Sequence, residues 1–505
     1  MTISRINLSF SAKTKANIAK SKIQLRALQF ASSLIRFAQK NPALMGRVER
    51  VLDKISSFTN VGYEPALVTG VQAGQDLTSS LDRLSDRLSL KEREARNHIL
   101  MMEAFGERVG FNSEAEWGLT QQHRLLRETA RKFAETNLTQ KFQEGLANEN
   151  KFPKQIFEKM AKLGLLGAII PEKFGGSNMD VRALAIIMEE LAYRSPSVAL
   201  SFDITGGLIP HIIMEHGTEE QKQKYLPGIV SGEIIGAFAL TEPDSGTDIS
   251  SMKTKAGRQG DKFIINGAKR FITNGSEADV IVLFAKLEGE EKKDKTFSTF
   301  LIDTRYLKDK GQLKVLEMNN KMGCHGTATA ELFFEDAEIP ESALIGEISM
   351  GRIIALGSLN LARIEIAALD LGAARRAFDI SSEYQKPRMS FGGFLAGKQL
   401  TQFRFGEMIV KLEQSRQLIY RAAWLADRGK DVRQAACLAK VSATDMAAEV
   451  IHMAQRKMGG DGYMKEYQVA QFFGDIMVSF PGEGDHDILT MAAGASALGL
   501  PRTSL

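Results

Sequence analysis

One segment of the sequence joins small residues to hydroxyl side chains at a turn where a ligand could approach the backbone closely. It reads AFALTEPDSGTD and runs from Ala237 to Asp248, leaving an expected strand and turning through Pro243 and Gly246. Small residues let another molecule come near the main chain, and Thr241 and Thr247 add hydroxyl groups. Taken alone, this composition is equally typical of an ordinary polar turn.

A second segment follows about 25 residues later on the same stretch of expected strands. It reads KRFITNG, from Lys269 to Gly275, and places an aromatic ring, Phe271, beside a hydroxyl, Thr273. Other familiar patterns are missing from the sequence, which has no P-loop, no HExxH and no glycine-rich turn inside a βαβ unit. His325 and His486 have no companions at metal-ligand spacing, so a structural role is favoured for both.

The spacing of apolar residues changes along the chain, and these changes indicate which helices and strands position the two segments. A length of 505 residues predicts two or three packed units. Helical periods over 119–137, 155–165 and 182–193 give way to strands near Ile234, and long helical periods return over 359–378, 402–428 and 432–458. We therefore predict a helical extension over 1–112, a helical domain over 113–235, a β-domain over 236–345 and a helical bundle over 346–505.

Short apolar runs define the β-domain. Phe263–Ile265 and Ala268–Thr273 flank Asn266-Gly267, which predicts a hairpin with a tight turn at that dipeptide. Further strands are expected over 280–285 and 297–302 and at Phe333-Phe334.

Composition narrows the class of protein. The chain is 44% hydrophobic and 25% charged with a net charge of +4, which is typical of a globular protein and gives no argument for nucleic-acid binding. Cys324 and Cys437 fit no disulfide framework, which indicates a reducing compartment. No run of about 18 uncharged apolar residues predicts a membrane span.

The N-terminus is basic, because no Asp or Glu precedes Glu49. This composition is compatible with a transit peptide, but it is rich in Lys and shows no cleavage site. A folded helical extension and a cytoplasmic location are preferred, with the mitochondrial matrix as the alternative.

Together the two polar segments resemble the signatures of the acyl-CoA dehydrogenase family. Ala239 to Asp248 is similar to A-x-T-E-P-x-[AS]-G-[ST]-D, and Phe271 to Asn274 to the aromatic-Ile-Thr-Asn motif. A third similarity is KMGCHGTATAELFFEDAEIP, from Lys321 to Pro340. The resemblance covers about residues 113 to 505 and implies an α+β, mostly α fold: an N-terminal helical domain, a middle β-domain and a C-terminal four-helix bundle.

The resemblance also implies a bound FAD. Around the flavin ring it places residues of the first two signatures: Phe238, Leu240, Thr241, Gly246, Thr247, Phe271, Ile272 and Thr273. For the rest of the cofactor it implies an Arg-x-x-Phe-Gly motif and its neighbours, in part from a second subunit: Arg388, Phe391, Lys398, Gln399, Arg456, Gly459, Gly460, Asp485 and Asp487. Sharing FAD between subunits implies a homodimer or homotetramer.

The implied reaction is removal of hydrogen from the α and β carbons of an acyl-CoA, which needs a base for the α-proton. SFPGEGDHDIL, from Ser479 to Leu489, resembles the family's Tyr-Glu-Gly-Thr-x-x-Ile and makes Glu483 the base. Some relatives carry the base on a helix, at the position of Ala362, which cannot act as one. The same comparison implies substrate contacts by Thr247, Asn360, Arg363 and Gly484.

Four positions depart from the family pattern. Gly482 replaces a Tyr beside the base, Asp485 replaces a Thr that touches FAD, Arg456 replaces a Gln, and His325 stands where Arg is common. We hypothesise that Arg456 and Asp485 compensate each other electrostatically near the cofactor.

The expected function is FAD-dependent acyl-CoA dehydrogenation, with electrons passed to an electron-transfer flavoprotein. An acyl-CoA oxidase-like enzyme that uses oxygen is one alternative. A non-catalytic flavoprotein scaffold is another, and the presence of Glu483 and of most FAD positions disfavours it.

Overall fold

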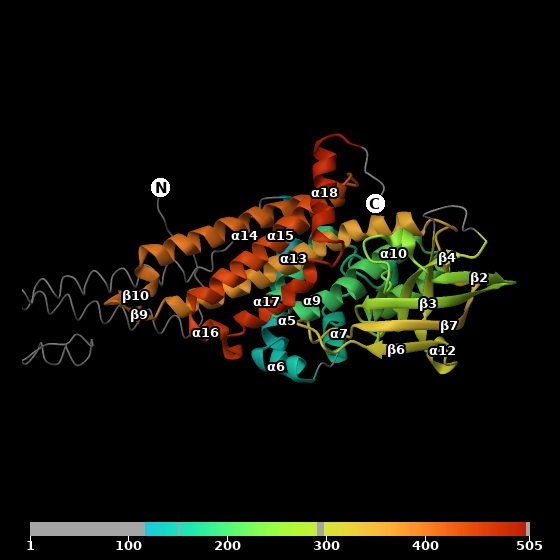
Figure 1. Ribbon diagram of the computed structural model, residues 1–505, viewed down its shortest axis with the longest axis horizontal. Coiled ribbons are helices and arrows are strands. Elements are labelled where there is room, and N and C mark those ends of the chain that lie inside the picture. The colour runs from blue at the N-terminus through green and yellow to red at the C-terminus, as the bar shows by residue number, and fades with distance from the viewer. Residues whose placement is uncertain (1–116, 150–151, 290–296, 501–505) are drawn as a thin grey trace, which may run out of the picture. The chain divides into compact units, whose positions relative to one another are not determined.

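The structure is a computed structural model that describes residues 117–149, 152–289 and 297–500, so the predicted extension over 1–112 lies outside the described residues. Residues 113–389 and 394–505 belong to one compact unit, and Ser390–Gly393 falls outside it. Within the described part of this unit, helices precede a β-sheet and further helices follow it (Figure 1). The predicted α+β, mostly α fold class is confirmed.

The helices before the sheet begin at residues suited to capping. Asp180 accepts a hydrogen bond from the Ala183 N–H at the start of α8, and Ser195 accepts one from Val198 at the start of α9. The helices expected over 119–137, 155–165 and 182–193 are confirmed as α5, α7 and α8. The bounds are α5 Gln121–Asn137, α6 Gln140–Glu149, α7 Lys154–Ala161, η4 Glu172–Phe174, α8 Val181–Ala192, α9 Pro196–Phe202, η5 Asp203–Leu208, α10 Ile209–His216 and α11 Glu219–Val230.

Three of these elements form one continuous helix, Pro196–His216, whose middle turn, η5, is a π-helix. By length and composition it is apolar enough to cross a membrane, yet 89% of its most apolar window is buried inside the fold. It carries the acid Asp203 in its middle. These properties are those of the central helix of a folded core.

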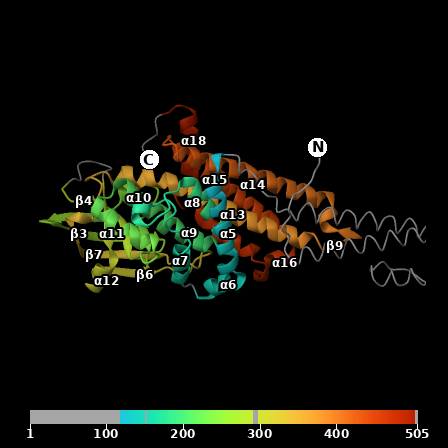
Figure 2. The same cartoon turned by 180° about the vertical axis from the view of Figure 1, so that it is seen from behind.

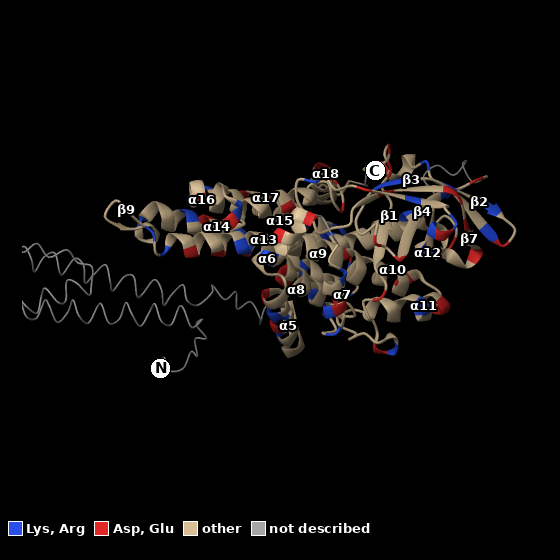
Figure 3. Cartoon of the chain, turned by 90° about the horizontal axis from the view of Figure 1, so that it is seen from below, with Lys and Arg blue, Asp and Glu red and all other residues tan. Residues whose placement is uncertain are grey.

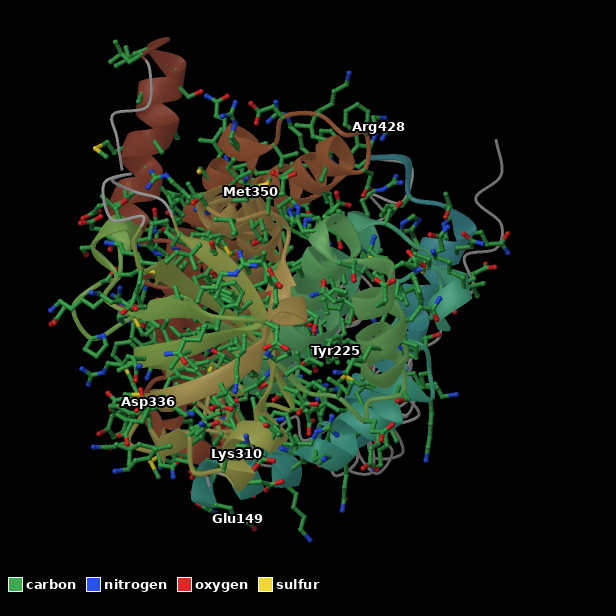
Figure 4. All side chains as sticks on the ribbon, turned by 90° about the vertical axis from the view of Figure 1, so that its right-hand side faces the viewer. Glu149, Tyr225, Lys310, Asp336, Met350 and Arg428 are labelled. Carbon is green, nitrogen blue, oxygen red and sulfur yellow. The ribbon has the colours of Figure 1, made fainter. Side chains whose placement is uncertain are left out.

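The sheet has eight strands in the order β6-β7-β3-β2-β4-β5-β8, with β1 pairing parallel to β4. Apolar side chains fill both of its faces, with Phe263 against Phe300 and Phe284 against Phe297. Tyr225 of α11 lies where the helices meet the strands, and Lys310 and Asp336 lie at the outer margin (Figure 4). The bounds are β1 Gly236–Ala239, η6 Ile249–Ser251, β2 Lys255–Gln259, β3 Lys262–Ile272, β4 Val280–Leu287, β5 Ser298–Asp303, α12 Thr304–Asp309, β6 Leu313–Glu317, β7 Ala330–Pro340, η7 Glu341–Ala343 and β8 Leu344–Ile345.

The predicted hairpin turn at Asn266-Gly267 is wrong. β3 runs through this dipeptide, and the turn lies between β2 and β3, where Gly260 has φ +63°. Between the pairs Ile265–Ala337 and Gly267–Phe334, Glu335 and Asp336 of β7 lie opposite the single residue Asn266, so β7 carries a β-bulge there. Asn266 stabilises the bulge by exchanging two hydrogen bonds with Asp336. The other expected strands are confirmed as β4, β5 and β7.

Long helices form the C-terminal part, and α13, α14 and α15 lie side by side (Figures 1 and 2). α13 is one unbroken helix that begins beside the sheet and runs the length of the bundle. The helices expected over 359–378, 402–428 and 432–458 are confirmed. The bounds are α13 Gly351–Gln385, β9 Met389–Ser390, β10 Gly393–Phe394, η8 Leu395–Gly397, α14 Gln399–Ala426, α15 Arg433–Lys457, α16 Gly460–Tyr463, η9 Lys465–Tyr467, α17 Val469–Ile476, η10 Met477–Ser479 and α18 His486–Ala497.

A buried charge cluster ties α8 to the bundle. Glu189 accepts hydrogen bonds from Arg375 at 2.6 Å, from Arg416 at 2.7 Å and from the Tyr420 hydroxyl at 2.7 Å. These guanidinium groups hold the pKa of Glu189 well below its usual value although burial acts to raise it. Along the described helices and strands, acidic and basic residues are interspersed (Figure 3).

Candidate active site

A buried ion pair brings the two polar segments of the β-domain together. Lys269 of β3 is fully buried, and its Nζ donates to Glu242 Oε1 at 2.7 Å and to the Leu240 carbonyl at 3.1 Å. Burial lowers the pKa of Lys269 to about 8, and Glu242 opposes that shift. Glu242 also accepts from the Thr254 N–H, so it fixes the turn that leads from Leu240 to Thr247. Sequence reasoning missed this pair, although both residues lie within the two motifs.

The second motif ends β3 in an unusual backbone conformation. Phe271 has φ +59° and a side chain that is 59% exposed, while the next residue, Ile272, is buried. Asn274, with φ +63°, donates from Nδ2 to the Ser201 carbonyl, the Thr205 hydroxyl and the Gly236 carbonyl. The motif is therefore anchored to the central helix and to β1. The Phe271 side chain stays 59% exposed, with the Arg270 guanidinium 4.8 Å from its ring centroid.

The predicted flavin-ring contacts lie on this connected surface with different exposures. Phe238 packs edge-on against Phe284 at 5.0 Å, and Leu240 is buried with its carbonyl accepting from Lys269, so both side chains belong mainly to the core. Thr241 and Thr273 are half-buried, and Gly246 and Thr247 are exposed. A Cβ added to Gly246 would meet no atom within 4 Å, so the turn is open at that point.

Glu483 lies in the loop between η10 and α18 and has a positive φ of +55°. Arg363 of α13 donates from Nε to the Glu483 carbonyl at 2.9 Å and from Nη1 to Asn360 Oδ1 at 2.9 Å. Gly484 follows with φ +115°, and a Cβ there would meet Leu489 at 3.2 Å and Arg363 Nη2 at 3.4 Å. The structure thus brings together the predicted base and the predicted substrate contacts Asn360, Arg363 and Gly484.

The electrostatic surroundings of Glu483 favour a carboxyl that can hold a proton. Burial raises the pKa of Glu483, while the charges of Arg363 and Lys440 act to lower it. Such a balance suits a base that must take a proton from carbon and release it later.

Two further buried carboxyls, which the sequence analysis missed, lie near Glu483. Asp203 of η5 and Glu365 of α13 are fully buried, and no described residue donates a hydrogen bond to any of their four oxygen atoms. The two side chains approach each other, so one of them must hold a proton if they are to hydrogen-bond. Burial, and then the charge of neighbouring acids including Glu483, raises the pKa of Asp203 well above its usual value.

A pocket of about 370 Å³ collects another group of predicted FAD contacts. Arg388 stacks on Tyr384 at 4.8 Å and lies 3.4 Å from Asp461 Oδ2. Added Cβ atoms on Gly459 and Gly460 would meet nothing within 4 Å, so backbone lines an open space there. Two guanidinium groups beside exposed backbone suit an anionic, phosphate-like group, which fits the cofactor that the sequence implies. The pocket is lined by Tyr384, Arg388, Leu395, Arg456, Lys457, Met458, Gly459, Gly460 and Asp461.

The remaining predicted contacts stand outside these groups. Phe391 is 94% exposed, Lys398 and Gln399 lie at the start of α14, and Asp487 lies in the first turn of α18. Asp485 caps α18, because its side chain accepts from the N–H groups of Asp487 at 3.1 Å and Ile488 at 3.3 Å. Thr and Asp are both good N-caps, which gives Asp485 a structural role at the position of the family's Thr.

The hypothesis that Arg456 and Asp485 compensate each other within one chain is wrong. Asp485 lies near Lys440, whereas Arg456 lies 16 residues further along α15. At 1.5 Å per residue the two regions are about 24 Å apart along the helix, beyond any direct pairing.

Comparisons with known proteins agree with this geometry. Three family models match: the N-terminal domain of acyl-CoA dehydrogenase over residues 120–233, the middle domain over 237–337 and the C-terminal domain over 349–498. An acyl-CoA dehydrogenase of Bacillus subtilis is 35% identical, covering 75% of this chain and 99% of that protein. Subunit CarC of the caffeyl-CoA reductase-Etf complex of Acetobacterium woodii is 35% identical, with coverages of 74% and 97%.

Among solved structures, butyryl-CoA dehydrogenase from Megasphaera elsdenii superposes with a TM-score of 0.72 at 34% identity, covering 75% of this chain and 99% of that one. The matched domains contain the two polar segments, the Glu483 loop and the Arg388 pocket. The protein therefore belongs to the acyl-CoA dehydrogenase family, whose members are FAD-dependent oxidoreductases that act on a CH–CH bond.

Proposed function

We propose that the protein dehydrogenates the α,β bond of an acyl-CoA thioester and that Glu483 removes the α-proton. One observation carries the proposal: Glu483 is half-buried, its carbonyl accepts from Arg363 Nε at 2.9 Å, and burial raises the pKa of its carboxyl. A raised pKa brings a carboxylate closer to the pKa of the carbon acid from which it must take a proton.

The surrounding residues would orient the thioester for this step. FAD, when bound, supplies the acceptor for the β-hydride. The turn at Thr241–Thr247 and the exposed ring of Phe271 would hold the flavin from the β-domain side, because the Glu242–Lys269 pair fixes both segments in one place. In the family the N–H of the base itself polarises the thioester carbonyl, and the positive φ of Glu483 would direct that N–H.

An electron-transfer flavoprotein is the proposed acceptor of the electrons. Support comes from the similarity to CarC, which is named as a subunit of a reductase-Etf complex. A reduced sample that reoxidises slowly in air but quickly with a purified electron-transfer flavoprotein would agree with this acceptor. Rapid oxygen consumption with acyl-CoA alone would instead assign an oxidase.

We further propose that two copies of the chain complete each FAD site. Arg363, beside the base, and Tyr384, beside the pocket, are 21 positions apart on the unbroken helix α13. They are therefore separated by roughly 32 Å along its axis. That span supports an arrangement in which the Arg388 pocket serves the cofactor of a neighbouring subunit. Sedimentation of the flavin-loaded protein would test it, and a monomer that retains full flavin would contradict it.

Cys324 and Cys437 are both buried and free, which supports the proposal of a reducing compartment such as the cytoplasm. Imaging of a C-terminally tagged full-length chain would test it, and location in another compartment would contradict it.

The central test is flavin bleaching under anaerobic conditions with butyryl-CoA and a panel of longer and branched acyl-CoAs. The wild-type protein should bleach, and Glu483→Gln should keep its flavin but lose at least 100-fold in reduction rate, since it removes the base. Glu335→Gln, which neutralises an exposed carboxylate on β7, is the matched control. Bleaching of Glu483→Gln at the native rate would refute the base assignment.

A further inference from the structure

Lys440 lies in the middle of α15, and its side chain is fully buried against the loop that carries Glu483. Its Nζ donates to the carbonyl of Phe480 at 3.0 Å and to the carbonyl of Gly484 at 3.0 Å. These two carbonyls stand at the beginning and the end of the loop. One buried ammonium group therefore ties together both ends of the segment that presents the base.

The loop needs such a restraint because its backbone conformation is unfavourable without it. Glu483 has a positive φ of +55°, which costs free energy in a residue with a Cβ, and Gly484 follows with φ +115°. Arg363 donates to the Glu483 carbonyl, which lies in sequence between the Phe480 and Gly484 carbonyls that accept from Lys440. Within the described residues, the carbonyls of Phe480, Glu483 and Gly484 thus all accept from cationic side chains, so the direction of the Glu483 side chain depends on both cations.

Charge adds a second effect. The charged and titratable groups that face Glu483 come from every element around it: Arg363 and Glu365 on α13, Asp203 on η5, Lys440 on α15, and Asp485 and His486 on its own segment. Asp203 and Glu365 oppose ionisation of Glu483, whereas Arg363 and Lys440 favour it. Burial lowers the pKa of Lys440 to about 8, with Asp370 and then Glu483 opposing that shift.

The hydrogen bonds of the Lys440 ammonium are directed to the Glu483 loop and not to the buried acid Asp370 of α13. The nearby Asp370 accepts from the Thr444 hydroxyl at 2.7 Å and from the Ser479 hydroxyl at 2.7 Å, which uses both of its oxygens. Both described hydrogen bonds of the Lys440 ammonium therefore go to carbonyls of the Glu483 loop.

We propose that Lys440 is a positioning residue for the dehydrogenation. It holds the Glu483 loop at both ends through the Phe480 and Gly484 carbonyls, and its positive charge favours the carboxylate that must accept the α-proton. The inference rests on the proposed function, and it adds a residue that neither the motif at Glu483 nor the helix motif at Arg363 contains.

The test compares Lys440→Met, Lys440→Gln and Lys440→Arg in the full-length, flavin-loaded protein. Anaerobic flavin reduction by butyryl-CoA is followed by stopped flow across pH. Lys440→Met should reduce flavin at least about tenfold more slowly, because the base is no longer held in place. Its pH–rate profile should also move to higher pH, because a charge that favours the carboxylate is gone.

The other two variants separate hydrogen bonding from charge. Lys440→Gln keeps donors for the loop without charge, so its rate at high pH should lie above that of Lys440→Met while its profile stays displaced. Lys440→Arg keeps the charge, so its profile should return toward that of the wild type. If the bulk of one variant prevents folding, the remaining two still decide the question.

Lys411→Met, which removes a half-exposed lysine paired with Glu449 on the bundle surface, is the matched control and should behave as the wild type. A native rate and a native pH profile in Lys440→Met would overturn the positioning role. Failure of the wild-type protein to bleach with any acyl-CoA would instead overturn the proposed function, so the two failures are distinct.

Discussion

Arg363 Nε donates a 2.9 Å hydrogen bond to the backbone carbonyl of Glu483, although the two residues lie 120 positions apart in the chain. The same guanidinium group reaches Asn360 Oδ1 at 2.9 Å. Arg363 therefore helps to hold the loop that carries the proposed base. A residue that the sequence suggests as a substrate contact also fixes the conformation of that loop.

Replacing Arg363 by Lys should slow flavin reduction more than it weakens substrate binding. An ammonium group cannot reproduce the planar set of donors that bonds the Glu483 carbonyl and Asn360 at once. A fall of about tenfold to 100-fold in the anaerobic reduction rate is expected, since small displacements of a base have effects of this size. Stopped-flow reduction at several acyl-CoA concentrations separates rate from binding, and an unchanged limiting rate would contradict the expectation.

The helical periods predicted most of the helices from sequence alone, and α13 to α15 could be predicted because their apolar period is long. Glu483 could be named as a candidate base because its neighbours resemble a family signature. The hairpin at Asn266-Gly267 was misplaced because the same dipeptide also fits a continuous strand that lies opposite a bulge in its neighbour. Only the pairing of β3 with β7 decides between them.

Buried polar groups could not be predicted because their partners are distant in the chain. Asp203 stands alone in an apolar helix, and nothing nearby in the sequence indicates that Glu365 meets it. Lys440 lies in an ordinary helical period, and its role depends on the path of the Glu483 loop. Tertiary packing, which no local pattern encodes, creates these contacts.

The Asp203–Glu365 pair should make the folded state less stable as pH rises. In the unfolded chain both carboxyls lose their protons near pH 4, whereas burial raises the pKa of each in the folded protein. Between about pH 5 and neutral pH the folded state therefore binds more protons, and the free energy of unfolding falls with increasing pH. Glu365→Gln removes one titrating group, so its decline should be shallower.

Urea unfolding at pH 5, 6, 7 and 8 measures that decline. Asp370 and Asp475 are buried acids whose pKa values are raised to about 7, so they contribute to the decline in both proteins, and only the difference between the wild type and Glu365→Gln is diagnostic. Glu335→Gln, at an exposed site, should leave the slope unchanged. Parallel slopes for the wild type and Glu365→Gln would show that Glu365 takes up no proton on folding, which would contradict the raised pKa of Glu365.

Gly207 leaves room for the Glu365 carboxyl, so Gly207→Ala should destabilise the fold. An added Cβ would lie 2.1 Å from Glu365 Oε2, and the carboxyl is buried against Asp203 and has little freedom to move. A loss of about 1–3 kcal/mol is expected from overpacking of this kind. Gly357→Ala is the control: its Cβ would meet nothing within 4 Å on α13, so it should stabilise by up to about 1 kcal/mol.

A double variant separates the clash from a general backbone effect. With Glu365→Ala in place, the carboxyl is gone and Gly207→Ala should cost much less than it does in the wild type. If Gly207→Ala lowers the free energy of unfolding equally in the wild type and in Glu365→Ala, as measured from urea midpoints, the strain lies elsewhere in η5.

Arg456→Gln should weaken retention of FAD, with an effect that shrinks as salt increases. Arg456 and Arg388 line one pocket with Gly459 and Gly460, and a second guanidinium adds attraction for a phosphate-like group there. Because the pocket is open to solvent, salt screens this attraction, so the variant should approach the wild type in FAD affinity at about 1 M NaCl.

The fluorescence of released FAD measures the dissociation constant without any turnover. Arg428 lies just beyond the C-terminal end of α14 (Figure 4), and its guanidinium lies 3.8 Å from the Trp424 ring centroid. Arg428→Gln therefore controls for loss of a surface charge. If Arg456→Gln and Arg428→Gln lower FAD affinity equally at low salt, Arg456 acts only through net charge and the pocket does not receive the cofactor.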